Sequence, residues 1–218
     1  MVGTITLFVI LFITVLSGSF VFLVWEDTPA NLPNDIKIIN HTDRIESLLS
    51  EYKKDMGNDL QAYKNHIYRV LTFTQHLLGD NNTKHRDVIE AALVFHDIGL
   101  WTNSNLAYLD PSADLAKERM KNEFNAEQLE LMYNIITNHH KFKPWTGPNE
   151  VIVNAVRKAD MIDFSLGFVT KGVSREHIRK VHEVLPNSGF HMALMSLFPT
   201  IHGWNVFNYA DIFQIFRM

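Results

Sequence analysis

The sequence contains no cysteine, so it has no disulfide framework, no thiolate zinc site, no iron–sulfur cluster and no cysteine nucleophile. It also lacks an excess of positive charge, because 20 Lys and Arg stand against 24 Asp and Glu, a formal net charge of −4. Binding of duplex nucleic acid needs a basic surface, so we expect no such partner. The hydrophobic content of 46% is typical of a globular fold and argues against disorder.

Charged side chains are absent from residues 1–25. The apolar run from Val2 to Trp25, as a helix rising about 1.5 Å per residue, is long enough to cross a hydrocarbon core of about 30 Å. A cleaved signal peptide has a basic start and a shorter apolar core, and this run has neither. We therefore predict a retained single-pass membrane anchor at 1–25, in preference to a signal peptide or a buried core helix.

Basic residues near the anchor lie only on its C-terminal side, and the first of them are Lys37 and Arg44. Because basic residues favour the cytoplasmic side of a membrane, we expect the body of the protein to face the cytoplasm. Residues 26–40 contain two prolines and three asparagines, which predicts a linker. Residues 41–218 are then the folded domain.

The body is predicted to be all-α, because strand signals are scarce and apolar residues recur at helical spacing. One helix is predicted over 60–78, stopped by Gly79, and a central helix, apolar on nearly every face, over 87–98, ending at Gly99. The other predicted helices begin at Pro111, at Asn125 with a capping box to Gln128, at Pro148 and at Ser174, and span 189–198 and 205–217. Together they predict a compact helical bundle.

Ionisable residues interrupt the apolar faces of these helices. His96 and Asp97 end the most buried helix, where a carboxylate needs a partner or a metal ion. The other inward-facing groups are His66, Asp160 and the adjacent pair His139 and His140. Taken singly, each fits a hydrogen-bonded core residue, a cap or a helix end as well as it fits a ligand. Taken jointly, ionisable groups that face inward from several helices indicate that they serve one shared site.

Three short motifs, HIYRV at 66–70, FHDIG at 95–99 and RKAD at 157–160, resemble those of the HD-domain superfamily of metal-dependent phosphohydrolases. The resemblance covers about residues 60–165. It implies an all-helical fold in which one divalent metal ion is held by His66, His96, Asp97 and Asp160. Two imidazoles and two carboxylates suit Mn²⁺, Fe²⁺, Co²⁺, Ni²⁺, Zn²⁺ or Mg²⁺ rather than a thiol-selected metal.

The resemblance also implies hydrolysis of a small phosphorylated substrate, such as a nucleotide, by a metal-activated water. The candidate acid, base or water-positioning residues are His139, His140 and Asp163. The candidate phosphate-binding residues are Arg69, Lys143 and Lys158. Two alternatives stay open from the residues themselves: Arg69 fits a buried ion pair with a carboxylate, and Asp163 fits a helix cap.

Parts of the sequence depart from the wider superfamily. Members with two metal ions carry extra histidines after the HD pair, whereas no histidine occurs here from Asp97 to Asn138, so we expect one ion rather than two. His191 has no role in this scheme. Three other functions stay open: a di-iron oxygenase, a hydratase of small nitriles such as cyanamide, and a non-catalytic nucleotide-binding module tethered to the membrane.

Overall fold

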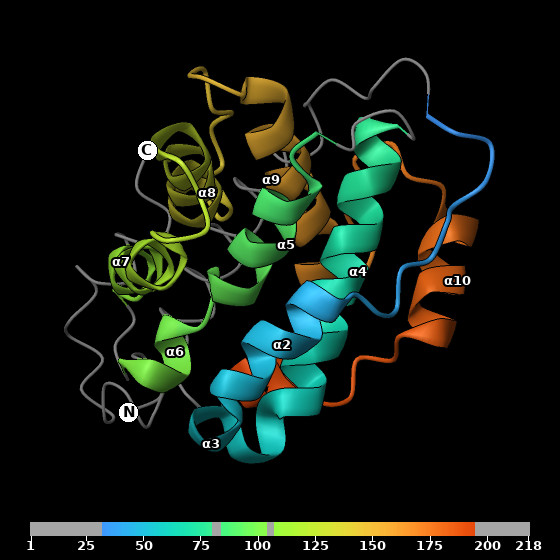
Figure 1. The fold of residues 1–218 in the computed structure, drawn as a ribbon. Coiled ribbons are helices and arrows are strands. Elements are labelled where there is room, and N and C mark those ends of the chain that lie inside the picture. The colour runs from blue at the N-terminus through green and yellow to red at the C-terminus, as the bar shows by residue number, and fades with distance from the viewer. Residues whose placement is uncertain (1–31, 80–83, 104–106, 195–218) are drawn as a thin grey trace, which may run out of the picture.

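The computed structural model describes residues 32–79, 84–103 and 107–194 (Figure 1). Regular structure in these residues is helical and includes no strand, which confirms the predicted all-α class. The predicted anchor at 1–25 and the predicted helix at 205–217 lie outside the described residues, and the one at 189–198 is described up to residue 194, helical from Phe190. No helix within the described ranges has the length and apolarity needed to cross a membrane.

The longest described helix, α4 (Leu60–Leu78), packs most extensively against α9 (Glu150–Phe164). Gly79 follows α4 with a φ of +74°, a left-handed conformation that glycine adopts at little cost, so the predicted stop of this helix is confirmed. In α9 the stripe of Ile152, Val156 and Asp160 faces inward, as its spacing predicts. The α4–α9 pair therefore forms one wall of the core.

Helix α5 (Arg86–Phe95) runs through the middle of the bundle, between α4 and α8 (Figure 1). Its apolar side chains from Val88 to Phe95 are fully buried, as expected for a helix that is apolar on nearly every face. The predicted helix end at Gly99 is wrong, because α5 ends at Phe95 and Gly99 begins the short α6 (Gly99–Thr102). A Cβ on Gly99 would lie 2.7 Å from the carbonyl oxygen of Tyr108, so glycine permits a close approach rather than a left-handed turn.

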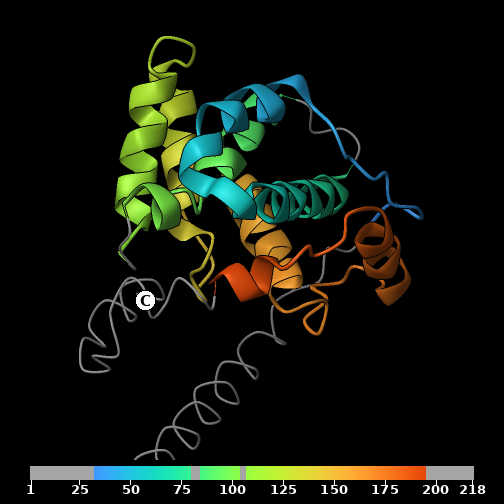
Figure 2. The ribbon, with the colours of Figure 1, turned by 90° about the horizontal axis from the view of Figure 1, so that it is seen from below.

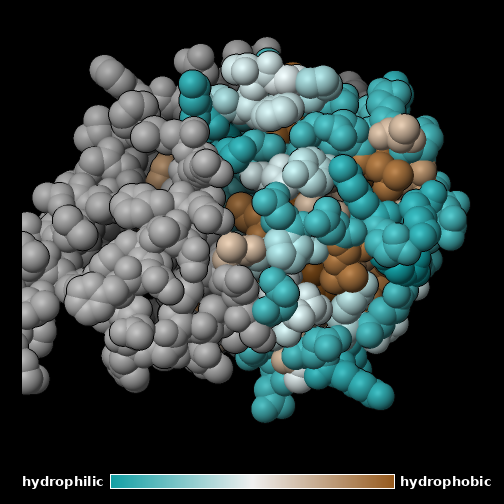
Figure 3. All heavy atoms as spheres, turned by 90° about the vertical axis from the view of Figure 1, so that its left-hand side faces the viewer, coloured by the Kyte–Doolittle hydropathy of each residue, from teal (hydrophilic) through white to brown (hydrophobic). Residues whose placement is uncertain are grey.

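The remaining helices cover this centre: α2 (Asp43–Glu51), α3 (Lys53–Met56), the 3₁₀ turn η1 (Gly57–Asp59), α7 (Leu109–Met120), α8 (Ala126–Asn138) and α10 (Arg175–Val184). The capping box of Asn125 with Gln128 at the start of α8 is confirmed, and so is the Ser174 cap of α10. Helix α7 begins two residues before Pro111, which lies in its first turn. The coloured surface on this side of the molecule is mainly hydrophilic, with separate apolar patches (Figure 3).

The second half of the predicted linker belongs to the packed body. Ile36 is buried, and the backbone N–H of Ile39 donates to Oγ1 of Thr72 in α4. Asp35 lies 3.5 Å from Nζ of Lys180 in α10. Because this segment packs alongside α4 and α10 (Figure 1), the boundary of the folded domain lies before residue 36 and not at residue 40.

Candidate metal centre

Four side chains from three parts of the chain meet inside the bundle. His66 comes from α4, His96 and Asp97 from the turn between α5 and α6, and Asp160 from α9, and none of the four is more than 3% exposed. Nε2 of His66 lies 2.9 Å from Nε2 of His96, 3.7 Å from Oδ2 of Asp97 and 3.4 Å from Oδ1 of Asp160. The structure therefore brings the four predicted ligands together.

The hydrogen bonds of the two imidazoles direct their lone pairs toward one point. Nδ1 of His66 lies 2.7 Å from Oδ2 of Asp163, and Nδ1 of His96 lies 2.7 Å from the carbonyl oxygen of Leu93. Both partners are acceptors, so each ring carries its proton on Nδ1 and leaves a lone pair on Nε2. Two lone pairs 2.9 Å apart repel one another unless a cation lies beside both. This spacing fits two nitrogen ligands of one metal ion, each bound at about 2.0–2.1 Å.

The two carboxylates of the cluster are charged and buried. Burial raises the pKa of Asp97 and of Asp160, but the neighbouring histidines outweigh it and hold both pKa values below the usual range. No Lys or Arg side chain within the described ranges forms an ion pair with either carboxylate. Buried charge without a basic partner is costly unless it coordinates a cation. Two nitrogen and two oxygen donors are the set that a divalent ion of intermediate softness prefers, so the residues fit such an ion.

His139 and His140, at the end of α8, join the same cluster. Nδ1 of His139 donates to the carbonyl oxygen of Ile136, and its Nε2 lies 3.2 Å from Oδ1 of Asp97. Nδ1 of His140 lies 3.3 Å from Oδ2 of Asp160. These contacts give two more groups of metal-binding spacing, His96 with Asp97 and His139, and His139 with His140 and Asp160. The cluster thus holds more donors than the four predicted ligands.

His140 is the most accessible member of the cluster, with a side chain 16% exposed, while His139 is fully buried. Burial lowers the pKa of His140, but hydrogen bonds and charge from Asp160 and Asp97 outweigh burial and raise it to about 10. By contrast, burial lowers the pKa of His96 to about 4. In the metal-free cluster His140 is therefore the imidazolium, with both ring nitrogens protonated, whereas His96 is neutral. His140 lies at the partly exposed edge of the cluster.

Asp163 hydrogen-bonds to His66 of the cluster, and Arg69 hydrogen-bonds to Asp163. Asp163 is fully buried and accepts hydrogen bonds from Nδ1 of His66 and from the guanidinium of Arg69, and these bonds outweigh burial and lower its pKa. Arg69 is also fully buried and donates to the carbonyl oxygens of Leu185 and Pro186. The prediction that Arg69 binds phosphate is therefore wrong, and the alternative of a buried ion pair is confirmed. Asp163 orients His66 and does not face a substrate.

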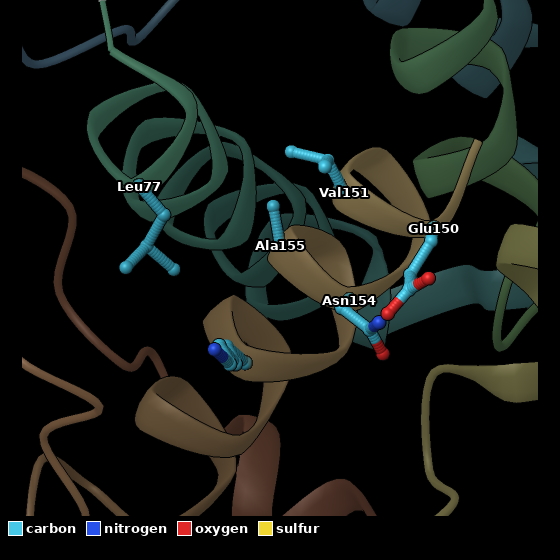
Figure 4. Close-up of a pocket in the computed structure, with 6 residues that line it drawn as sticks. Leu77, Glu150, Val151, Asn154 and Ala155 are labelled. Carbon is cyan, nitrogen blue, oxygen red and sulfur yellow. The ribbon is translucent and has the colours of Figure 1, made fainter. Parts of the chain in front are cut away.

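Neither predicted lysine reaches the cluster. Lys143 lies in the exposed loop after α8. Lys158 lies on α9 two residues before Asp160, and residues so spaced do not share a helix face. Its side chain lines a pocket at the other end of the α4–α9 pair (Figure 4). The structure thus gives no support to a phosphate role for Lys143 or Lys158.

Three aromatic residues that are not among the predicted site residues complete the site. The hydroxyl of Tyr108 donates to Oδ1 of Asp97 and lies 2.5 Å from Nε2 of His140, and the hydroxyl of Tyr63 accepts from the backbone N–H of Asp97. Phe190 stacks on His66 with ring centroids 4.1 Å apart. Tyr63 precedes His66 by three residues on one helix face, a signal available in the sequence. Phe190 had none, because only the fold brings it there.

The position of His191, unexplained by the sequence, follows from its hydrogen bonds. Its Nε2 donates to the carbonyl oxygen of Phe164 at the end of α9, and its Nδ1 accepts from Asn187. His191 therefore joins the segment that carries Phe190 to the end of α9.

The HD-domain family model matches residues 63–165. This segment is an HD domain. It includes all six cluster residues together with Asp163 and Arg69, and HD domains are generally metal-dependent hydrolases. Comparisons of the chain with curated proteins and with solved structures found no significant match. The HD domain and the donors within it therefore indicate metal-dependent hydrolysis as the general class of reaction.

Proposed function

We propose that this chain is a membrane-tethered phosphohydrolase that depends on a divalent metal ion and acts on a small phosphate ester such as a nucleotide. The observation that carries the proposal is the meeting of two imidazole lone pairs and two buried carboxylates, with separations of 2.9–3.9 Å. The HD domain supports hydrolysis as the reaction class. The tether rests on the uncharged run of residues 2–25, with the body on the cytoplasmic side.

The ion would be held by His66, His96, Asp97 and Asp160, and it supplies Lewis acidity and lowers the pKa of a bound water. The other residues have their own tasks. Asp163 keeps the proton of His66 on Nδ1, so that Nε2 points inward. Phe190 covers one face of the His66 ring and excludes water from it.

Proton transfer to the leaving group falls to His140. It is partly exposed, its Nδ1 lies 3.3 Å from Oδ2 of Asp160, and its Nε2 lies beside the hydroxyl of Tyr108. A positioned acid of this kind contributes about 10²–10⁴ to the rate. No lysine or arginine in the described residues pairs with the carboxylates here, so in this proposal the ion matches the charge of the phosphate.

The test uses the full chain in detergent or lipid, with metal content measured before the assay. We expect Mn²⁺-dependent hydrolysis of a chromogenic phosphomonoester or phosphodiester, followed by a preference within a nucleotide panel. Asp160→Asn should abolish it, while Val151→Ala, an exposed position on the same helix, should not. Bound metal with no hydrolysis of any ester would contradict the proposal.

The additional donors favour one second candidate. His139 and His140 lie near Asp97 and Asp160 with spacings that suit another ion, and a two-ion centre is what the di-iron oxygenase hypothesis needs. Two irons per chain with oxygen uptake, in place of ester hydrolysis, would replace the phosphohydrolase by this second function.

A further inference from the structure

Exposed apolar side chains gather at one place on the described surface. Four of its large hydrophobic residues lie at the end of α9 and on the segment bonded to it, and their exposed fractions are 46% for Phe164, 52% for Leu166, 75% for Phe168 and 70% for Met192. We call these four residues the apolar rim. Figure 2 shows the end of α9, the loop that follows it and the segment before residue 194 along one edge of the molecule. Such clustering of apolar surface marks a contact with another phase or molecule.

The two segments of the rim form one surface. The carbonyl oxygen of Phe164 accepts a hydrogen bond of 2.9 Å from Nε2 of His191, and the two rings lie 6.0 Å apart. Met192 is the next residue. In the other segment, the backbone N–H of Phe168 donates to the carbonyl oxygen of Ser165 in a tight turn. The rim is therefore a fixed part of the fold.

The rim borders the open edge of the metal centre. The ring of Phe164 lies 6.4 Å from that of His140, which is the most accessible member of the cluster. Whatever covers the rim therefore lies next to the entrance of the site.

The rim loop and the first described residues both contact α10. Gly167, inside the rim loop, packs so closely on Ile178 of α10 that a Cβ would approach Cγ2 of Ile178 to 2.7 Å. On the same stretch of α10, Lys180 contacts Asp35. Only residues 26–31 separate Leu32 from Trp25, the last residue of the apolar run. At about 3.3–3.6 Å per extended residue, Trp25 is at most about 25 Å from Leu32.

We propose that the apolar rim inserts into the interfacial layer of the phospholipid bilayer that holds residues 2–25. The short connection keeps the rim near that bilayer, so that even a weak affinity is sufficient for contact. Phe, Leu and Met side chains gain free energy on entering the boundary between headgroups and acyl chains. A second copy of the chain is a less suitable occupant, because nothing brings it as close. The open edge of the metal centre then faces the lipid surface.

The absence of cysteine allows a direct test, since one introduced thiol is a unique labelling site. Phe168→Cys places a fluorophore on the rim. Val151→Cys places it at the opposite end of α9, at a residue with a similar exposed fraction of 71%. Both full-length variants go into vesicles of phosphatidylcholine and phosphatidylglycerol. We expect the label at 168 to be quenched several-fold more strongly by nitroxide-bearing lipid than the label at 151, and several-fold less by aqueous iodide.

Equal iodide quenching at the two positions would overturn the proposal. Shielding of position 168 from both quenchers, relieved by diluting the protein with lipid, would overturn it in favour of a contact between copies. Failure of the chain to float with the vesicles would overturn it as well. Metal content and hydrolysis of a soluble ester, measured on the same sample, report separately on the proposed function.

A second pair of variants tests the apolarity of the rim, with the label kept at position 166 in both. Phe168→Glu, combined with a labelled Leu166→Cys, should lose most of the lipid quenching, because a carboxylate does not enter the interface. The matched variant Val151→Glu, with the same label at 166, should keep it. Because both positions are exposed, neither change disturbs the core, and equal lipid quenching in the two variants would contradict the proposal.

Discussion

The α4–α9 helix pair has two ends that carry different chemistry. One end buries His66, Asp160 and Asp163, none more than 2% exposed. The other end borders a pocket of about 250 Å³, lined by Leu77, Val151 and Ala155 together with the polar residues Glu150, Asn154 and Lys158 (Figure 4). The comparison shows that packing this pair needs no buried carboxylates. The charges at the first end therefore need the cation that we propose to explain them.

The largest expected effect is the loss of metal on changing a ligand at the charged end. Asp160→Asn keeps the shape but removes the charge, and should weaken metal binding by more than about 100-fold, since even indirect partners of a metal contribute about 10–100-fold. Asp97→Ala should do the same and also destabilise the fold, because it leaves the buried hydroxyl of Tyr108 without its acceptor. Titration calorimetry of the metal-free full chain measures the affinity. Unchanged affinity in both variants would show that the ligand assignment is wrong.

The next effect concerns His140, which we place beside the ion rather than in its coordination shell. His140→Gln should lower kcat by about 10²–10⁴ and leave the metal content near that of the wild type. Elemental analysis and steady-state kinetics on one sample separate the two quantities. Loss of metal together with activity would instead make His140 a ligand, as the two-ion alternative requires.

A smaller effect on metal binding is expected on changing Asp163, which hydrogen-bonds to the ligand His66. Asp163→Asn can still accept a hydrogen bond but no longer neutralises Arg69, and should weaken metal binding by about 10–100-fold. The tautomer of His66, read from nitrogen chemical shifts, should become mixed. An unchanged tautomer would mean that Asp163 serves the fold alone.

The same residue gives a pH dependence of stability. Because His66 and Arg69 lower the pKa of Asp163 in the folded state, its contribution to stability is complete above the unfolded pKa of about 4 and is lost as the pH falls below it. Thermal unfolding of the metal-free chain between about pH 6 and pH 3 should therefore show a steeper loss in the wild type than in Asp163→Asn. Parallel curves would contradict this role.

The smallest effect on metal binding is expected at the pocket end of the α4–α9 pair. Leu77→Ala removes a side chain that is 9% exposed beside the pocket, and should cost about 2 kcal/mol of unfolding free energy, the lower end of the range for such a change. Metal affinity should stay within about twofold of the wild type, because the change lies far along α4 from His66. A large loss of metal would break the contrast between the two ends.

The sequence predicts the helices whose signals are local. Gly79, the capping box at Asn125 and the Ser174 cap each end or begin a helix as predicted. It does not predict α2, although Thr42 caps this helix and Ile45, Leu48 and Leu49 are buried. It also misplaces the end of α5, because the role of Gly99 is set by its contact with Tyr108 and not by its own backbone.

For the site, the sequence predicts the residues that motif spacing connects, and the structure brings His66, His96, Asp97 and Asp160 together. It does not settle the role of Arg69, because an arginine one turn from a ligand fits a substrate contact and a buried ion pair equally. Only the position of Asp163, fully buried against Arg69, decides between them. Phe190 depends on a contact between distant segments and has no local signal.

The account depends on one physical statement, that the lone pairs of His66 and His96 share a divalent cation with two carboxylates. Elemental analysis of the purified full chain, beside Asp160→Asn and Val151→Ala, tests it most directly. The account predicts a stoichiometric divalent ion in the wild type and in Val151→Ala, and its loss from Asp160→Asn. A wild-type chain without metal after incubation with Mn²⁺, Fe²⁺ and Zn²⁺, or an Asp160→Asn variant that keeps its full content, would contradict it.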